Sequence, residues 1–79
     1  MRIDKFLKNS RLIKRRSVSK EACEKGFVFV NDKVAKPGTT VNVNDIIRIE
    51  FGNSTLSARV LDVTDSQKKE DASKMYEVI

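Results

Sequence analysis

The chain has 79 residues, a net charge of +5 and one cysteine, which indicates a single small domain without an internal disulfide. It has no histidine, so a Cys/His zinc cluster is excluded and stability has to come from a small core or a bound partner. No run approaches the roughly 20 apolar residues of a membrane span, nothing near Met1 resembles a signal peptide, and a lone thiol fits a reducing compartment, so we expect a cytoplasmic protein.

Residues 2–9 have the spacing of a short amphipathic helix, with apolar residues on one side and cations on the other. The apolar residues are Ile3, Phe6 and Leu7, and the cations are Arg2, Lys5 and Lys8. Asp4 lies in the first turn, where the helix dipole favours a carboxylate. We expect this helix to end near residues 9–10, and Leu12 and Ile13 to turn inward after it.

The segment from Arg11 to Gly26 combines dense positive charge with apolar positions. It predicts a second helix over about residues 16–25, with Gly26 as the residue that ends it. The residues expected to face inward are Val18, Ala22 and Cys23. The start of the helix stays open between two alternatives, Ser17 as N-cap or Arg15 as the last non-helical residue.

After Gly26 the apolar spacing changes from about 3.6 residues to two, which predicts strands. We expect strands over 27–30, 33–36, 46–51 and 56–63, an extended piece beginning at Val41 and Val43, and an edge strand over 75–79. The turns are expected at Asn31-Asp32, Pro37-Gly38, Asn44-Asp45 and residues 52–54. A helical turn or two is expected through residues 68–74, capped by Asp65 or Ser66. Two helices followed by short antiparallel strands indicate an α+β domain over residues 1–79.

The charge is polarised along the chain. Residues 1–36 hold eleven Lys/Arg and four Asp/Glu, a balance of +7, whereas residues 37–79 hold five and seven, a balance of −2. General solubility would scatter the charge, while a polarised charge is expected when one half of a chain meets phosphates. We therefore predict that the first half binds RNA. The candidate RNA-binding residues are Arg2, Lys5, Arg11, Lys14, Arg15, Arg16 and Lys20.

Four short motifs resemble one RNA-binding family, the S4 domain, which is named after ribosomal protein S4 of the small subunit. The motifs are Arg2-Ile3-Asp4-x-x-Leu7, Lys14-Arg15-Arg16-Ser17, Gly26-x-Val28-x-Val30-Asn31-Asp32 and Asn44-Asp45-Ile46-Ile47. The resemblance covers about residues 1–50 and leaves residues 51–79 as a C-terminal hairpin and tail. It implies an αL-type fold, in which two short N-terminal helices pack on a small, mainly antiparallel sheet and the helical face grips structured RNA.

The whole chain is similar to free-standing S4 proteins of bacterial ribosome-associated quality control, which are related to a small S4 heat-shock protein. The similar residues are 2–8, 10–16, Lys68-Lys69-Glu70, Ala72 and Met75-Tyr76. This resemblance implies binding to rRNA and tRNA on obstructed large ribosomal subunits that carry peptidyl-tRNA, in support of C-terminal alanine tailing of the stalled chain. It also implies a partner that recruits alanyl-tRNA. We expect the chain to act as a monomer.

Two positions depart from the S4 pattern. Many S4 domains place Ser or Thr immediately before the arginine that opens the second helix, where its hydroxyl would cap the helix. Arg15 occupies that position here, so the chain gains a phosphate ligand and loses a cap of about 1 kcal/mol. The Asn-Gly turn common after the first strand is Asn31-Asp32, and aspartate tolerates positive φ less easily than glycine.

Arg2 and Arg16 lead the candidates because both coincide with the family motif. An arginine fork can bridge two phosphate oxygens or stack on an unpaired base, and duplex RNA presents mainly phosphates and 2′-hydroxyls. Asp4 would repel phosphate, so we expect it to orient an arginine of the same patch or to stabilise the helix start. The alternative is a direct contact with a 2′-hydroxyl.

The remaining reactive and aromatic residues have simpler expectations. Cys23 is expected to be a small buried hydrophobe. Phe27 and Phe29 alternate with Val28 and Val30, so one pair is expected in the core and the other partly exposed, and an exposed phenylalanine could stack on a base. The role of Tyr76 stays open.

No residue pattern supports catalysis, a cofactor or a metal site. There is no histidine, no Ser or Cys with a recognisable base, no spacing of carboxylates for a metal and no glycine-rich phosphate loop. Two alternatives to quality control remain: a generic ribosome-assembly or translation-associated RNA binder of the same fold, and a protein-interaction module whose basic face meets an acidic protein. The second half, with its edge strand, could also contact a protein.

Overall fold

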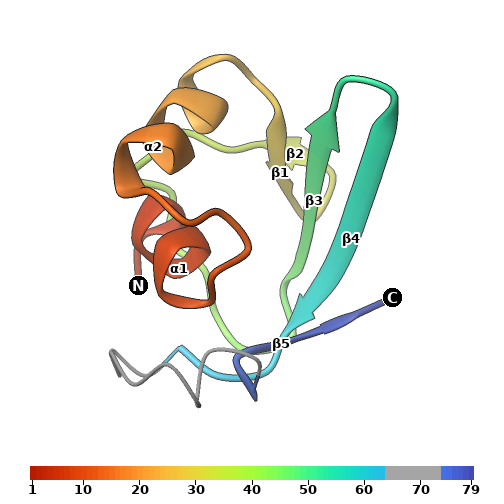
Figure 1. Ribbon diagram of the computed structural model, residues 1–79. Helices are drawn as coiled ribbons and strands as arrows, with labels where there is room; N and C mark the ends of the chain where they lie inside the picture. Colours follow the sequence, from red (N-terminus) through yellow and green to blue (C-terminus); the bar gives the residue numbers. More distant parts are fainter. Residues whose placement is uncertain (64–73) are drawn as a thin grey trace.

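The computed structural model describes residues 1–63 and 74–79. Two short helices lie against one side of a five-stranded sheet (Figure 1). Helix α1 spans Ile3–Asn9 and helix α2 spans Arg16–Glu24. Both predicted helices are confirmed, and the start of α2 is settled, because Arg15 is its extended N-cap residue and Ser17 is already helical.

The C-terminal end of α2 has the geometry that the sequence predicts for Gly26. Gly26 has φ +79, a conformation in which any Cβ would be strained. Its N–H donates to the carbonyl of Cys23, and the N–H of Phe27 donates to the carbonyl of Ala22. These two bonds form a Schellman motif, which places Phe27 beside the last turn of α2.

The inward face of α2 differs from the prediction at one position. Val18 was expected inside, but it is 46% exposed, and Ser19 is fully buried in its place beside Cys23. Ser19 can be buried because its hydroxyl donates to the carbonyl of Arg15 at 3.2 Å, which satisfies its polar group within the helix. The buried face of α2 is therefore shifted by about one residue from the face that its apolar residues define.

The sheet has the strand order β2-β1-β3-β4-β5, and all its pairings are antiparallel. The strands are β1 (Val28–Val30), β2 (Lys33–Val34), β3 (Ile46–Phe51), β4 (Ser54–Val60) and β5 (Tyr76–Val78). The α+β prediction is confirmed, including the edge strand β5. Strands β2 and β4 are shorter than expected, since residues 35–36 and 61–63 are not in strands.

Two turns explain how the strands are connected. Asn31 and Asp32 have φ of 51 and 67, so the hairpin between β1 and β2 closes with two left-handed residues, as in a type I′ turn. The extended piece predicted at Val41 and Val43 is wrong for Val43, which lies in an exposed turn. The turn forms because the carboxylate of Asp45 accepts the N–H of Asn42 at 2.8 Å.

The core lies between the helices and one face of the sheet. From the sheet it takes Val28, Val30, Ile47, Ile49 and Val60, which alternate along β1, β3 and β4. From the helices and their link it takes Ile3, Phe6, Leu7, Ile13 and Cys23. Val28 and Val30, which alternate with the two phenylalanines, are thus core. Phe51, on the same side of β3 as Ile49, extends past the core and is 47% exposed.

Two further expectations concern the chain as a whole. The helical turn expected through residues 68–74 falls on residues 64–73, which lie outside the described part of the chain, apart from Lys74 at its end. None of the helices that the structure describes is long and apolar enough to cross a membrane.

Candidate nucleic-acid interface

The first turn of α1 is fixed by a loop from the middle of the chain. The N–H of Ile3 donates to the carbonyl of Thr39 at 2.7 Å, and the N–H of Asp4 donates to the carbonyl of Pro37 at 3.3 Å. An isolated β-bridge joins Arg2 to Thr40. These bonds satisfy N–H groups that a helix N-terminus leaves without partners, and they fix the backbone from which Arg2 and Asp4 project.

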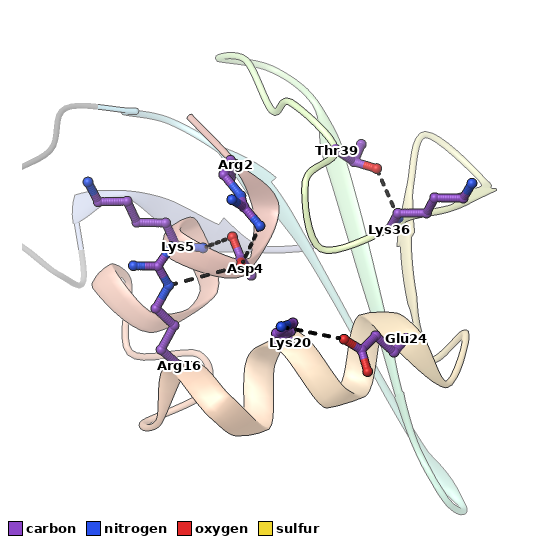
Figure 2. A network of polar contacts seen from close by, with 8 residues as sticks. All are labelled: Arg2, Asp4, Lys5, Arg16, Lys20, Glu24, Lys36 and Thr39. Carbon is purple, nitrogen blue, oxygen red and sulfur yellow. Dashed lines mark hydrogen bonds and ion pairs between the residues drawn. The ribbon is translucent and has the colours of Figure 1, made fainter.

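Asp4 lies between Arg2, the N-cap residue of α1, and Arg16, the first residue of α2. Its Oδ2 accepts a hydrogen bond from Nη2 of Arg2 at 3.2 Å and lies 4.0 Å from Nε of Arg16 (Figure 2). Its Oδ1 accepts the N–H of Lys5 at 2.8 Å. A buried carboxylate has to be paired and hydrogen-bonded to be tolerated, and these contacts meet both conditions. We call Arg2, Asp4 and Arg16 the Asp4 cluster.

In the Asp4 cluster the carboxylate is buried and the guanidinium groups are exposed. The side chain of Asp4 is 2% exposed, whereas those of Arg2 and Arg16 are 54% and 55% exposed. One carboxylate therefore serves two guanidinium groups, which leaves a net positive charge at the surface. The arrangement can present two arginine forks in a fixed relation, which suits phosphate oxygens.

Lys5 extends the Asp4 cluster along α1. Met1, Arg2, Lys5 and Val63 line a surface hollow of about 360 Å³. Lys5 is half-buried, so its aliphatic stem packs on the protein while its ammonium can reach solvent. Arg2 and Lys5 thus share one hollow, Arg2 from the N-cap of α1 and Lys5 from its first turn.

Lys20 follows Arg16 by one turn of α2. The two residues are four positions apart, so they lie on one face of the helix. The Nζ of Lys20 lies 4.0 Å from a carboxylate oxygen of Glu24, and both side chains are more than half exposed. This surface pair contributes little to stability, and a phosphate could compete for the ammonium.

The other three candidate residues lie in the link between the helices. Lys14 and Arg15 are exposed and directly precede Arg16, while Arg11 is exposed with φ 61. Arg11 is the residue after the C-cap of α1, a place where the left-handed conformation favours glycine. The structure therefore brings Arg2, Asp4, Lys5 and Arg16 together. Among residues 1–63 and 74–79, no hydrogen bond or ion pair joins the side chains of Arg11, Lys14 or Arg15 to that group.

The positioning loop was missed by sequence reasoning. Pro37-Gly38 predicts a turn, but nothing local indicates that this turn docks on residues 1–4. Thr39 secures the loop, because its hydroxyl accepts the N–H of Lys36 at 2.9 Å. The side chain of Lys36 points away from Arg2 and Arg16 (Figure 2), so the loop positions the site without adding its cation to it.

Cys23 lies in the core behind the Asp4 cluster. Its side chain is a buried free thiol, as predicted. Burial, together with the smaller effects of the negative charges of Asp4 and Glu24, raises the pKa of the Cys23 thiol to about 11. A thiol with this pKa stays protonated at neutral pH, so it is unsuited to nucleophilic chemistry.

The aromatic residues have different environments. Phe29 is half-buried on the outer face of the sheet, with the guanidinium carbon of Arg48 4.2 Å from its ring centroid. Phe27 is 46% exposed and follows the C-terminal end of α2, at the opposite end of that helix from Arg16. Tyr76 is half-buried on β5. Whether any of them stacks on a base stays a prediction. In the described chain, no group of three His, Cys, Asp or Glu could hold a metal ion.

Comparisons with known proteins place these features in context. Residues 1–47 match the model of the S4 domain family. All of the chain is 54% identical to the RQC P-site tRNA stabilizing factor of Streptococcus pneumoniae, covering 90% of it, and 99% of the chain is 50% identical to the factor of the same name from Halalkalibacterium halodurans, covering 89% of it. The trimeric structure of heat shock protein 15 from Vibrio cholerae matches all of this chain and 81% of its own at a TM-score of 0.90 and 26% identity.

Proposed function

Because this chain belongs to the S4 domain family, we propose that it is an RNA-binding factor of ribosome-associated quality control. It binds rRNA and tRNA on obstructed large ribosomal subunits that still carry peptidyl-tRNA. The names of its relatives support this proposal, since proteins 54% and 50% identical along nearly the whole chain are called RQC P-site tRNA stabilizing factors.

The observation that carries the proposal is the Asp4 cluster. Two exposed guanidinium groups, one from the N-cap of α1 and one from the first residue of α2, share one buried carboxylate, at 3.2 Å and 4.0 Å. Because the carboxylate fixes both arginines before RNA arrives, less side-chain entropy is lost on binding. Lys5, Lys20 and the link residues Arg11, Lys14 and Arg15 add cations around this centre, which act on phosphates at longer range.

The role that we propose in alanine tailing follows from tRNA binding. By stabilising the peptidyl-tRNA, the factor supports the addition of alanines to the C-terminus of the stalled chain, together with a partner that recruits alanyl-tRNA. It acts in the cytoplasm by binding and not as an enzyme. We propose that it does so as a monomer, which sedimentation equilibrium of the purified chain would test against the trimer reported for the Vibrio cholerae protein.

The experiment that tests the proposal compares two arginine variants in sucrose gradients of cell extract. Arg16→Ala removes one guanidinium from the Asp4 cluster. Arg59→Ala is the matched control, since Arg59 is 46% exposed and pairs only at the surface of the sheet, with Glu77 at 3.5 Å. Both substitutions lower the net charge by one.

We expect the wild type and Arg59→Ala to migrate with free large subunits that contain peptidyl-tRNA, and Arg16→Ala to stay at the top of the gradient. A hydrogen bond to a charged group is worth about 1.5–3 kcal/mol, so the Arg16 variant should lose about ten-fold or more in affinity. Binding to assembling subunits without peptidyl-tRNA would favour the generic RNA binder instead. An equal loss of binding in both variants would mean that the net charge of the protein, and not the Asp4 cluster, determines binding.

A filter-binding assay on structured RNA tests the electrostatic part separately. If about five cations meet phosphates, the log–log slope of affinity against salt should be about −4 to −5. Binding that does not respond to salt would contradict the RNA interface and would favour a protein-interaction module.

A further inference from the structure

An apolar groove lies between α2, the link before it and the end of β3, and no residue of the Asp4 cluster lines it. It encloses about 320 Å³, near the lower end of the roughly 300–1,000 Å³ of ligand sites. Three large side chains in it are about half exposed: Val18 from α2, Phe27 from the turn after α2, and Phe51 from the end of β3. Figure 1 shows the α2–β1 turn and the β3–β4 hairpin at the same end of the molecule.

The walls of the groove are held by backbone hydrogen bonds. The N–H of Phe27 donates to the carbonyl of Ala22 at 3.0 Å, and the N–H of Glu50 donates to the carbonyl of Phe27 at 2.8 Å. These bonds connect α2 to Phe27 and Phe27 to β3, next to Phe51. The groove is therefore formed before anything occupies it, which lowers the entropic cost of binding.

The charges around the groove disfavour RNA. Glu21, Lys25 and Glu50 border it. The ammonium of Lys25 lies 2.8 Å from a carboxylate oxygen of Glu21, and this contact lowers the pKa of Glu21 and raises that of Lys25. These two charges offset each other, and the exposed Glu50 has no ion-pair partner among the contacts described for residues 1–63 and 74–79. The rim is thus net negative, which repels phosphates and attracts a cation.

The groove and the proposed RNA face occupy different sides of α2. Val18, Ala22 and Lys25 are spaced by four and three residues and form one stripe along the helix. Arg16 and Lys20 form another stripe, since each is two positions before a residue of the first and a two-residue step is about 200° around a helix. Both surfaces can therefore be occupied at once.

We propose that this groove binds a peptide segment of a protein partner, one that inserts an apolar side chain between Phe27 and Phe51 and places a Lys or Arg near Glu50. The volume suits one or two side chains, in the manner of an anchor residue. This proposal does not depend on the proposed RNA function. The side of α2 that carries Val18 and Ala22 would bind a protein, and the side that carries Arg16 and Lys20 would bind RNA.

The test is a selection from a library of random 12-residue peptides displayed on phage, with the full chain as target. Counter-selection against Phe51→Thr removes peptides that bind elsewhere, including acidic peptides on the cationic face. Threonine suits a strand, and the amide NMR spectrum of the variant shows whether it is folded. The matched control is Val34→Thr, since Val34 is 61% exposed on β2 and lies outside the groove.

We expect the selected peptides to share an apolar anchor beside a Lys or Arg, and to shift the amide signals of Val18, Phe27 and Phe51. Phe51→Thr should lower the affinity of the selected peptide about ten-fold or more, while Val34→Thr leaves it unchanged. Glu50→Gln should lower it about two- to five-fold, as expected for an exposed ion pair.

Three outcomes would overturn the proposal. The first is a selection without a Phe51-dependent consensus, or one enriched in acidic peptides. The second is self-association of the chain that Phe51→Thr abolishes, which would assign the groove to a second copy. The third is a shift of the Phe27 and Phe51 amides on addition of an RNA duplex, which would assign it to nucleic acid.

Discussion

Two arginine–aspartate contacts lie on opposite sides of the sheet, and they differ in which residue is exposed to solvent. The arginines are exposed in one contact and the aspartate in the other. In the Asp4 cluster the carboxylate is 2% exposed, and Arg2 and Arg16 are 54% and 55% exposed. On the outer face, Arg48 lies 2.8 Å from Asp32, and here the arginine is 33% exposed and the aspartate 89%. The same pair of residue types thus displays cations at one place and an anion at the other.

The difference follows from what surrounds each pair. Asp4 lies in the first turn of α1 against the core, where the backbone N–H of Lys5 and two arginines compensate its charge. Arg48 is instead covered by the ring of Phe29, at 4.2 Å from its centroid, and it reaches out to a carboxylate in a turn. An ion pair by itself therefore does not predict a binding site, and the exposed member decides which ligand the pair can take.

Replacing each aspartate by asparagine gives the largest expected contrast. Asp4→Asn removes a negative charge from a cationic face, so simple electrostatics predicts tighter RNA binding. If Asp4 orients the two arginines, affinity should instead fall about ten-fold, and the free energy of unfolding should fall by about 1 kcal/mol because a carboxylate is lost from the helix start. Filter binding and urea denaturation measure the two effects.

Asp32→Asn is the matched control for this substitution. It changes the net charge equally and removes an exposed pair worth about 0.5 kcal/mol, and we expect RNA affinity to stay the same within two-fold. Unchanged or tighter binding by Asp4→Asn would contradict the orienting role and leave Asp4 as a part of the helix start only.

Arg11→Gly separates RNA binding from stability in the same region. Arg11 has φ 61, and the left-handed conformation costs a non-glycine residue about 1–2 kcal/mol. Because glycine adopts it without strain but is more flexible when unfolded, we expect the variant to gain about 0.5–1 kcal/mol of stability. Losing one cation should lower RNA affinity about three-fold, as filter binding would show. If the variant is more stable and binds RNA as tightly as the wild type, Arg11 is not part of the RNA interface.

Local signals account for the parts of the fold that could be predicted from sequence. The apolar spacing of residues 3–7, the glycine at position 26 and the alternation in β3 each act over a few residues, and the structure confirms each of them. Val18 and Val43 show the limit of this reasoning. Val18 was expected to face the core and Val43 to lie in an extended piece, but Ser19 satisfies its own hydroxyl in the core and a turn exposes Val43.

The candidate site was predictable only as a set of residues. Motif and charge single out Arg2, Asp4 and Arg16, yet their convergence depends on the packing of α1 against α2 and on the loop at Thr39. Such long-range contacts leave no trace in local spacing. The groove at Phe27 and Phe51 was missed for a related reason, since alternation says which residues share a face but not where the covering helix ends.

Phe29→Leu tests the outer-face pair with a smaller expected effect. Removing the ring that Arg48 covers should cost about 0.5–1 kcal/mol of unfolding free energy, measured by urea denaturation, and should leave RNA affinity unchanged. Phe27→Leu is the control, because Phe27 has no cation over its ring in the described structure and should cost less. A loss of RNA affinity in Phe29→Leu would mean that the outer face also meets RNA.

The smallest expected effect is a change in the pKa of Cys23, a core residue that responds to the charge of Asp4. The pKa of Cys23 is raised to about 11, mainly by burial and in smaller part by the negative charges of Asp4 and Glu24. Asp4→Asn should therefore lower the pKa of Cys23, while leaving it above its ordinary value because burial is the larger cause. The ultraviolet absorbance of the thiolate during a pH titration measures this shift, and Asp32→Asn should cause none.

The same titration has a consequence for stability. The folded state keeps the Cys23 proton to a higher pH than the unfolded chain does, so the unfolding free energy should fall as pH rises from about 9 to about 11. In Asp4→Asn this fall should end at a lower pH, because the folded-state pKa is lower. An identical pH dependence in both proteins would mean that the field of Asp4 does not reach Cys23. The carboxylate would then be screened by its arginines on the core side as well, and the contrast with Asp32 would be one of exposure alone.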